Sequence, residues 1–142
     1  MLRRSHPPER GNRVLTARSV MRKDVVTVRH DTPVKDAVAL LRHHRISGLP
    51  VVDAEGRLVG IVTEKDVMRL LYEEAGSLPT VGDLMTPNVR AFHPDDPLGE
   101  VCDCLMANHF RRVPIVEYGK LVGLISRADL MDTILELVTE RG

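Results

Sequence analysis

The chain has 142 residues, 43% of them hydrophobic, which is enough for one ordinary core or two small ones and excludes the intrinsically disordered class. Its 20 basic and 20 acidic residues give a formal net charge of zero, so no overall field attracts nucleic acid or an anionic membrane. The longest apolar runs are about five residues long, which is strand length and far too short to cross a membrane.

The chain begins with a basic segment, residues 1–17, that we expect to be a flexible arm. Residues 1–23 hold seven basic side chains and one acidic side chain, Glu9. No apolar stretch follows the basic start, so the segment is not a secretory signal, and we expect a cytoplasmic protein that does not bind membranes. The arm offers phosphate contacts to a nucleic acid, but the zero net charge and the 3% aromatic content argue against nucleic acid as the partner.

Beyond the arm, the chain consists of two copies of one sequence unit. A shift of 64 positions superimposes Met21 on Met85 and Pro50 on Pro114. After a one-residue deletion the shift becomes 63, and G-I-V-T-E-K-D, which starts at Gly60, then superimposes on G-L-I-S-R-A-D. In each copy the deletion falls in a glycine-containing segment between two apolar runs, which predicts a hairpin turn there. The agreement spans about 45 residues per copy, so the chain is an internal repeat.

Each copy is predicted to fold as β-α-β-β-α, which makes an α+β protein. In the first copy, Thr32 is suited to the N-cap of the first helix and Pro33 to its first position. Asp96 and Pro97 take the same places in the second copy. The predicted elements are strands at 25–28, 49–53 and 57–63 with helices from 34 and over 64–74, then strands at 89–92, 113–117 and 120–126 with helices from 98 and over 127–139.

The domain boundaries follow from the repeat and from the turn-forming residues between the copies. The segment G-S-L-P-T-V-G-D, residues 76–83, carries glycine, serine and proline and is predicted to be a linker. We therefore expect an arm over 1–17, a first repeat over 18–75 and a second repeat over 84–142. A unit of this size buries a modest share of its surface alone, so we expect the two repeats to pack on each other.

A hydroxyl and a carboxylate recur three residues apart at the start of the second helix of each copy. They are Thr63 and Asp66 in the first copy, and Ser126 and Asp129 in the second. One interpretation is structural, because Thr-x-x-Asp and Ser-x-x-Asp are variants of the helix capping box. The other is functional, because a helix N-terminus attracts phosphate and a carboxylate accepts hydrogen bonds from both hydroxyls of a ribose. The sequence leaves both interpretations open, and both can hold together.

With these motifs in place, the chain resembles the tandem CBS-domain pair, also called the Bateman module. The resemblance covers residues 18–139. It implies two repeats with pseudo-twofold symmetry, a homodimer, and clefts between the repeats that bind an adenosine nucleotide. The stretches that carry it are V-M-R-K-D-V-V-T-V-R-H-D-T-P, G-L-P-V-V-D and G-I-V-T-E-K-D in the first copy, and L-M-T-P-N-V, R-R-V-P-I-V-E and G-L-I-S-R-A-D in the second.

The resemblance also implies roles for individual residues. Asp66 and Asp129 are expected to hold ribose hydroxyls. Thr63 and Ser126 are expected to approach a phosphate or ribose oxygen. A slot for the purine is expected from further positions, most of which suit the hydrophobic core equally well. The binding residues implied in this way are Thr27, Ile46, Leu49, Pro50, Phe110, Arg111, Arg112, Val113 and Pro114.

Two adjacent arginines, Arg111 and Arg112, distinguish the second copy from the first, which has Ser47 and Gly48 at the same places. Their charges suit a phosphate chain, yet only one of two neighbours on a strand faces a given side. The alternative is that both are ordinary solvated residues at the edge of a strand.

The sequence carries no motif of a metal site or of a known catalytic centre. Cys102 and Cys104 fall about 200° apart around a helix, so they do not share a metal ion. We therefore expect a stand-alone regulatory module without catalytic activity, which binds AMP, ADP, ATP or S-adenosylmethionine and signals through a protein partner or its own assembly. The alternatives are a structural dimer with empty clefts and a nucleic-acid contact through the basic arm.

Overall fold

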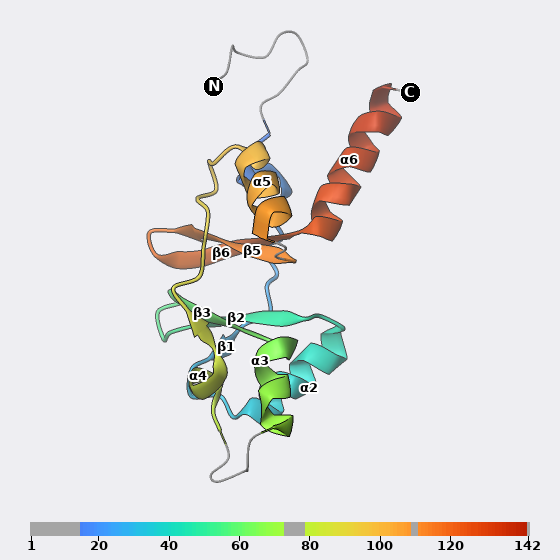
Figure 1. Ribbon diagram of the computed structural model, residues 1–142. Coiled ribbons are helices and arrows are strands. Elements are labelled where there is room, and N and C mark those ends of the chain that lie inside the picture. Colours follow the sequence, from blue (N-terminus) through green and yellow to red (C-terminus); the bar gives the residue numbers. More distant parts are fainter. Residues whose placement is uncertain (1–14, 73–78, 109–110, 142) are drawn as a thin grey trace.

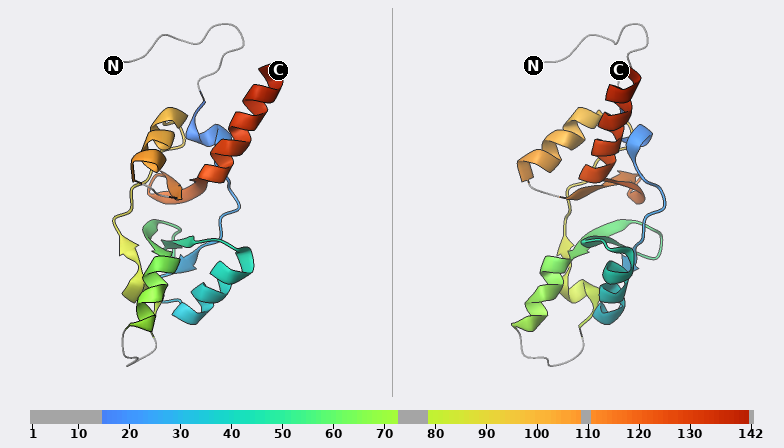
Figure 2. Two further views of the ribbon diagram at one scale, coloured as in Figure 1. Left: turned by 45° about the vertical axis from the view of Figure 1, so that its right-hand side comes forward. Right: turned by 90° about the vertical axis from the view of Figure 1, so that its right-hand side faces the viewer.

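The computed structural model describes residues 15–72, 79–108 and 111–141 of the chain (Figure 1). Two small sheets face each other across the middle of the molecule, and helices lie on the outer side of each sheet (Figures 1 and 2). This α+β arrangement of two repeats confirms the predicted fold class. Most of the predicted arm lies outside the described residues, as do Phe110 and residues 76–78 of the predicted linker.

The first repeat forms a sheet with the strand order β1-β2-β3-β4. β1 (Val28–Arg29) is parallel to β2 (Gly48–Val52), and β2 forms an antiparallel hairpin with β3 (Leu58–Thr63). β4 (Thr86–Pro87) pairs antiparallel with β3, although it lies at the start of the second repeat. The helices of this half are α2 (Val34–His44), α3 (Glu64–Met68), the 3-10 turn η1 (Arg69–Leu71) and α4 (Val81–Leu84).

The second repeat forms an antiparallel hairpin of β5 (Arg112–Glu117) and β6 (Lys120–Ser126). Phe92 adds a parallel bridge to β5, and Arg22 adds an antiparallel bridge to β6. Arg22 stands 64 positions before Thr86, so each sheet is completed by the segment that begins the other repeat. The helices of this half are α1 (Ala17–Val20), α5 (Leu98–Asn108) and α6 (Arg127–Arg141).

Each half has its own hydrophobic core, and each core also contains a residue from the segment before the other repeat. Ala17 of α1 is fully buried in the core of the second repeat, and Val81 of α4 in the core of the first. Equivalent hydrogen bonds hold the two short helices: the Ala17 N–H donates to the Asp96 carbonyl (3.0 Å), and the Val81 N–H donates to the Thr32 carbonyl (2.8 Å). The predicted linker therefore contributes to a core, and the predicted domain boundaries stay a prediction.

The glycine turns of the two hairpins lie against each other. The Leu58 N–H donates to the Gly119 carbonyl (3.2 Å), and the Leu121 N–H donates to the Gly56 carbonyl (3.0 Å). Gly56 and Gly119 have φ angles of 83° and 79°, a left-handed region that glycine enters without strain. The predicted hairpin turns are confirmed, and they also connect the two repeats.

The predicted N-cap role of Thr32 is wrong. Its hydroxyl accepts a hydrogen bond from the Arg29 N–H (3.0 Å), and Pro33 stands at the N-cap of α2 without a side-chain cap. Asp96 makes the equivalent contact in the second repeat, where its carboxylate accepts a hydrogen bond from the His93 N–H (2.9 Å). Both side chains close the turn that precedes the helix, where an unpaired backbone N–H needs a partner.

The predicted lengths of several elements also differ. The strand expected at 25–28 is reduced to β1, and the strand expected at 89–92 to the bridge at Phe92, because each segment touches the edge of a hairpin only briefly before it turns. The helix expected at 64–74 is α helical to Met68 and continues as the 3-10 turn η1. The last helix begins as predicted and extends to Arg141.

Candidate functional site

The repeated hydroxyl and carboxylate form the same capping box in both repeats. In the first, the Asp66 N–H donates to the Thr63 hydroxyl (3.2 Å), and the Thr63 N–H donates to Asp66 Oδ2 (2.9 Å). In the second, the Asp129 N–H donates to the Ser126 hydroxyl (3.2 Å), and the Ser126 N–H donates to Asp129 Oδ2 (2.8 Å). The capping interpretation is confirmed, and it holds each carboxylate at the N-terminus of a helix, where negative charge is favoured.

These capping contacts use one oxygen, Oδ2, of each carboxylate. The other oxygen of Asp129, Oδ1, lies 3.7 Å from Nη1 of Arg22. Asp129 is only 8% exposed, whereas the Arg22 side chain is 65% exposed and has room to move. A buried carboxylate whose second oxygen faces an exposed cation 3.7 Å away is a suitable acceptor for ligand hydroxyls.

The glycine of the repeated motif is required by a close approach of another segment. A Cβ at Gly60 would lie 2.8 Å from Met85 Sδ and 2.8 Å from the Thr86 carbonyl oxygen. A Cβ at Gly123 would lie 2.6 Å from Met21 Sδ. In both repeats, a methionine from the start of the other repeat covers the strand that leads to the capping box, so the motif is positioned from outside its own repeat.

A cleft of about 320 Å³ opens between the repeats beside Asp129, and we call it the Asp129 cleft. Residues of the first repeat form one wall, and residues of the second repeat form the other. The first wall consists of Arg22, Asp24, Val25, Val26, His44, Ile46, Gly48 and Pro50. The second wall consists of Arg112, Leu124, Ser126 and Asp129.

The Asp129 cleft brings together several of the residues expected from the sequence, but not all of them. Leu49, Val113 and Pro114 are buried almost completely, so the core interpretation applies to them. Thr27 is half-buried and does not line the cleft. Phe110 lies outside the described residues. The predicted residues that do line the cleft are Ile46, Pro50, Arg112, Ser126 and Asp129.

Sequence reasoning missed the segment around Arg22 and Asp24. Both lie before the first predicted strand, in a stretch whose repeat equivalent begins at Thr86. They reach the cleft because this segment bridges to Leu124 of the second repeat. The repeat alignment alone does not contain this signal, because it shows which residues are equivalent but not which half they pack against.

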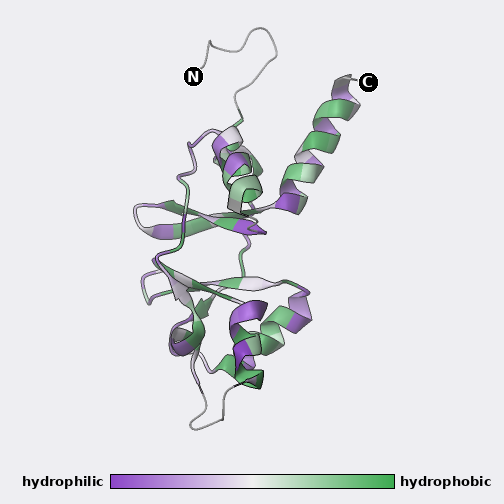
Figure 3. Cartoon of the chain, viewed as in Figure 1, coloured by the Kyte–Doolittle hydropathy of each residue, from purple (hydrophilic) through white to green (hydrophobic). Residues whose placement is uncertain are grey.

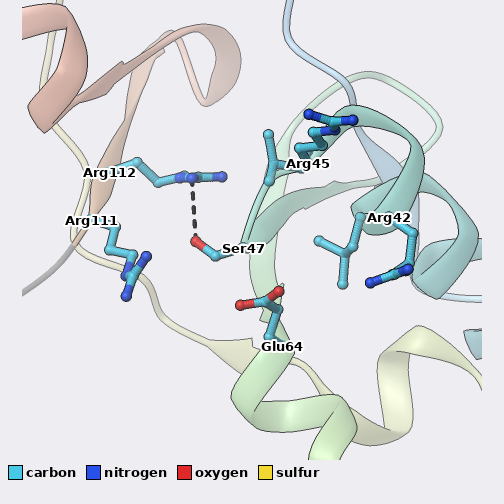
Figure 4. A pocket seen from close by; sticks show the side chains of 8 residues that line it. Arg42, Arg45, Ser47, Glu64, Arg111 and Arg112 are labelled. Carbon is cyan, nitrogen blue, oxygen red and sulfur yellow. Dashed lines mark hydrogen bonds between the residues drawn. The ribbon is translucent and has the colours of Figure 1, made fainter.

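A second cavity of about 470 Å³ adjoins the Asp129 cleft, and we call it the arginine pocket. The two cavities share Ile46 and Arg112 as lining residues. Figure 4 shows that the side chains come from both repeats and that Ser47 lies near its centre. Its lining residues are Leu41, Arg42, Arg45, Ile46, Ser47, Glu64, Arg111 and Arg112.

Arg112 crosses from the second repeat to the first. Its Nη1 donates to the Gly48 carbonyl (2.9 Å) and its Nη2 to the Ser47 hydroxyl (3.3 Å), as Figure 4 shows for the latter. Its Nε is buried and has no hydrogen-bond partner among the described residues. Burial lowers the pKa of the Arg112 guanidinium, and the neighbouring charge of Arg111 lowers it further. Of the two adjacent arginines, Arg112 lines both cavities and is partly buried, whereas Arg111 lines the arginine pocket alone and is exposed.

Two further observations concern the part of the chain that the structure describes. It contains no group of three or more His, Cys, Asp or Glu side chains arranged to hold a metal ion. None of its helices is both long and apolar enough to cross a membrane.

Comparisons with known proteins agree with this geometry. The family model for the CBS domain matches residues 17–73 and again residues 81–136, once for each repeat. A protein of Methanocaldococcus jannaschii, the uncharacterized protein MJ1225, is 30% identical over 114 residues, which are 80% of this chain and 41% of that protein. The chain thus spans less than half the length of this relative.

Two solved structures are similar over most of both chains. CBSX2 of Arabidopsis thaliana in complex with AMP has a TM-score of 0.76 and 32% identity, over 86% of this chain and 97% of that one. The CBS domain pair of protein MJ0100 in complex with 5'-methylthioadenosine and S-adenosyl-L-methionine has a TM-score of 0.75 and 28% identity, over 86% and 97%. The chain therefore belongs to the CBS-domain family, as a tandem pair of CBS domains.

Proposed function

We propose that this chain is a regulatory module without catalytic activity, which binds an adenosine nucleotide in the Asp129 cleft. The observation that carries the proposal is the position of Asp129. Its carboxylate is buried, is held by Ser126 at the N-terminus of α6, and lines a cleft built from both repeats. The complexes of CBSX2 with AMP and of the MJ0100 pair with S-adenosyl-L-methionine support an adenosine compound as the ligand.

In this proposal the two ribose hydroxyls donate to Asp129, and Arg22 moves away from Oδ1. A diol donates two hydrogen bonds to one carboxylate, and a charged acceptor strengthens both. The Ser126 hydroxyl is in reach of a phosphate or ribose oxygen at the same helix terminus. The purine packs against the apolar residues of the cleft, which are Val25, Val26, Ile46, Pro50 and Leu124.

Binding in this cleft joins the two repeats, because its walls come from both. A ligand that contacts both repeats stabilises the arrangement in which the walls are close, and so shifts the population of states that a protein partner meets. By repeat symmetry, Thr63 and Asp66 are proposed to serve an equivalent cleft. AMP, ADP, ATP and S-adenosylmethionine are all candidates for the ligand.

We also propose that the module is a homodimer through the helices that close the repeats. Met131, Leu135 and Val138 of α6 are 58%, 64% and 54% exposed and lie on one face of the helix. Leu71 and Tyr72 at the end of the first repeat are 82% and 89% exposed. α6 extends away from the body of the molecule, and Figure 3 shows hydrophobic residues along it. Exposed apolar side chains grouped in this way are typical of a contact surface.

The test of nucleotide binding is a calorimetric titration of AMP into the wild-type protein and into Asp129→Asn. The asparagine retains an acceptor for the Ser126 N–H but loses the charge that holds the ribose. We expect an affinity about 10-fold to 100-fold lower, as for the loss of a hydrogen bond to a charged group.

The matched control is Asp83→Asn. Asp83 forms the same kind of capping box at α4, where the Thr80 N–H donates to its Oδ2 (2.9 Å), but it lines neither cavity. Its AMP affinity is expected to equal that of the wild type. Equal AMP affinity in Asp129→Asn, or no binding of any adenosine compound to nucleotide-free protein, contradicts the proposed function and favours a structural dimer with empty clefts.

A further inference from the structure

The arginine pocket concentrates positive charge between the two repeats. Arg42, Arg45, Arg111 and Arg112 line it, and Glu64 is its one acidic lining residue. Four positive side chains and one negative side chain leave a local excess of three positive charges. Like charges gathered in one cavity repel each other, and a bound anion removes that cost.

The four arginines approach the pocket from opposite sides. Figure 4 shows Arg111 and Arg112 on the second repeat, and Arg42 and Arg45 at the end of α2 in the first. Arg45 ends α2 with a φ of 55°, a left-handed conformation that glycine adopts more easily than arginine. An anion between these groups meets guanidinium donors from both sides, which is the arrangement that favours several phosphate oxygens.

One donor in the pocket lacks an acceptor. Arg112 Nε is buried, and no described residue accepts a hydrogen bond from it, while its two Nη atoms are used by Gly48 and Ser47. A buried guanidinium donor without a partner is costly, and a phosphate oxygen is the acceptor that suits it best. The incomplete hydrogen bonding of Arg112 is a second observation beside the charge count, and an anion that draws Arg112 into the pocket would satisfy it.

The arginine pocket is a neighbour of the Asp129 cleft, because Ile46 and Arg112 line both cavities. A nucleoside held at Asp129 therefore lies beside Arg112, which the neighbouring pocket shares with Arg42 and Arg45. We infer that the arginine pocket binds the β and γ phosphates of an adenosine polyphosphate, and that Arg42 and Arg45 make the module prefer ATP to AMP. This inference rests on the proposed nucleotide binding at Asp129 and adds the class of nucleotide.

The experiment is a set of calorimetric titrations with ATP, AMP and inorganic tripolyphosphate. The variants are Arg42→Gln, which removes one charge from an exposed helix position, and Arg45→Gly, which removes the side chain and suits the left-handed backbone. The matched control is Lys35→Gln, which removes one charge from the same helix two turns away from Arg42. Thermal unfolding of each variant verifies that it is folded.

For the wild type we expect ATP to bind at least about tenfold more tightly than AMP, as for one or more charge-assisted phosphate contacts. Arg42→Gln and Arg45→Gly are each expected to lower the ATP affinity about tenfold and to leave the AMP affinity within about twofold. Lys35→Gln is expected to change neither. Glu64→Gln, which removes the opposing charge, is expected to raise the ATP affinity.

The outcomes separate this inference from the proposed function. If AMP binds as tightly as ATP and the arginine variants change nothing, the inference is overturned while nucleotide binding at Asp129 stands. If neither nucleotide binds, the proposed function fails, and the tripolyphosphate titration still tests the pocket. Tripolyphosphate binding that Arg42→Gln weakens supports a polyphosphate site in the arginine pocket. Absence of tripolyphosphate binding overturns that site.

Discussion

Gly60 and Gly123 are covered by methionines from outside their own repeats, Met85 and Met21. The two contacts differ in kind. For a Cβ at Gly60 the three nearest atoms include the Thr86 carbonyl oxygen as well as Met85, whereas for a Cβ at Gly123 all three belong to the Met21 side chain. A side chain can move aside more cheaply than a carbonyl in a strand pair, so Gly60 is the more restrictive position.

We expect Gly60→Ala to lower the free energy of unfolding by about 1–3 kcal/mol, the usual cost of overpacking. The measurement is urea unfolding of both proteins, followed by circular dichroism. The matched control is Gly99→Ala in α5, where an added Cβ meets nothing within 4 Å. Because alanine favours a helix, that variant is expected to gain about 0.5–1 kcal/mol. Equal unfolding midpoints for wild type and Gly60→Ala would contradict the close approach.

At the scale of elements, the contact between the two hairpins depends on Asp53 and Arg57. Asp53 accepts from the Arg57 N–H (2.9 Å) and the Glu55 N–H (2.9 Å), and it pairs with the Arg57 guanidinium (3.0 Å). Arg57 in turn bridges to Lys120 of the other hairpin. The backbone hydrogen bond from Arg57 is the main cause that lowers the pKa of Asp53 below its ordinary value of 3.8.

A lowered pKa means that the ionised Asp53 stabilises the fold at neutral pH. That contribution is complete above the ordinary pKa of 3.8 and is lost as the pH falls through the lower pKa of the folded state. We expect Asp53→Asn to unfold at a lower urea concentration than the wild type at pH 7, with the difference shrinking below pH 3.8. Urea titrations at several pH values measure it. A constant difference across this range would show that the carboxylate charge is not involved.

The second element-scale feature is the exposed apolar face of α6. Leu135→Glu places a charge in the middle of that face and is expected to convert a dimer into a monomer, because burying an unpaired charge is strongly unfavourable. Light scattering after size-exclusion chromatography measures the mass. Glu140→Lys is the control. Glu140 lies nine positions after Met131, which puts it on the opposite side of the helix. A wild-type protein that is already monomeric at high concentration would refute the proposed dimer.

At the scale of the whole molecule, each core is completed by the segment that precedes the other repeat. Ala17 and Val81 are both fully buried, in the second and the first core respectively. The paired hairpin turns connect the halves again at Gly56 and Gly119. The two repeats therefore depend on each other for their cores, and we expect them to unfold together.

Val81→Ala tests this dependence. Removing two buried carbons is expected to lower the stability of the whole chain by about 2 kcal/mol. Calorimetry should still show one cooperative transition, at a lower temperature than for the wild type. The reason is that α4 and β4 lose their packing when the first core unfolds, so the two halves cannot unfold separately. Two separated transitions, with only one of them shifted by the variant, would show that the repeats fold independently.

The amino-acid sequence by itself determined the fold class, the repeat, the hairpins and the capping boxes. These features are local: glycine at a turn, alternating apolar residues, and a hydroxyl three residues before a carboxylate each specify a conformation through their immediate neighbours. The resemblance that these motifs carry also implies binding roles for Asp129 and Ser126. The relevant residues are close in the chain, so their pattern is visible in it.

Only the tertiary structure decided which half each leading segment packs against. It thereby placed Arg22 beside Asp129 and brought Arg42 and Arg45 within one pocket with Arg111 and Arg112. These residues come from both repeats, and their proximity depends on how two sheets face each other. The same information was missing for Leu49 and Val113, whose apolar side chains fit a core or a purine slot equally well until burial is known. Long-range packing, which no local pattern encodes, separates these cases.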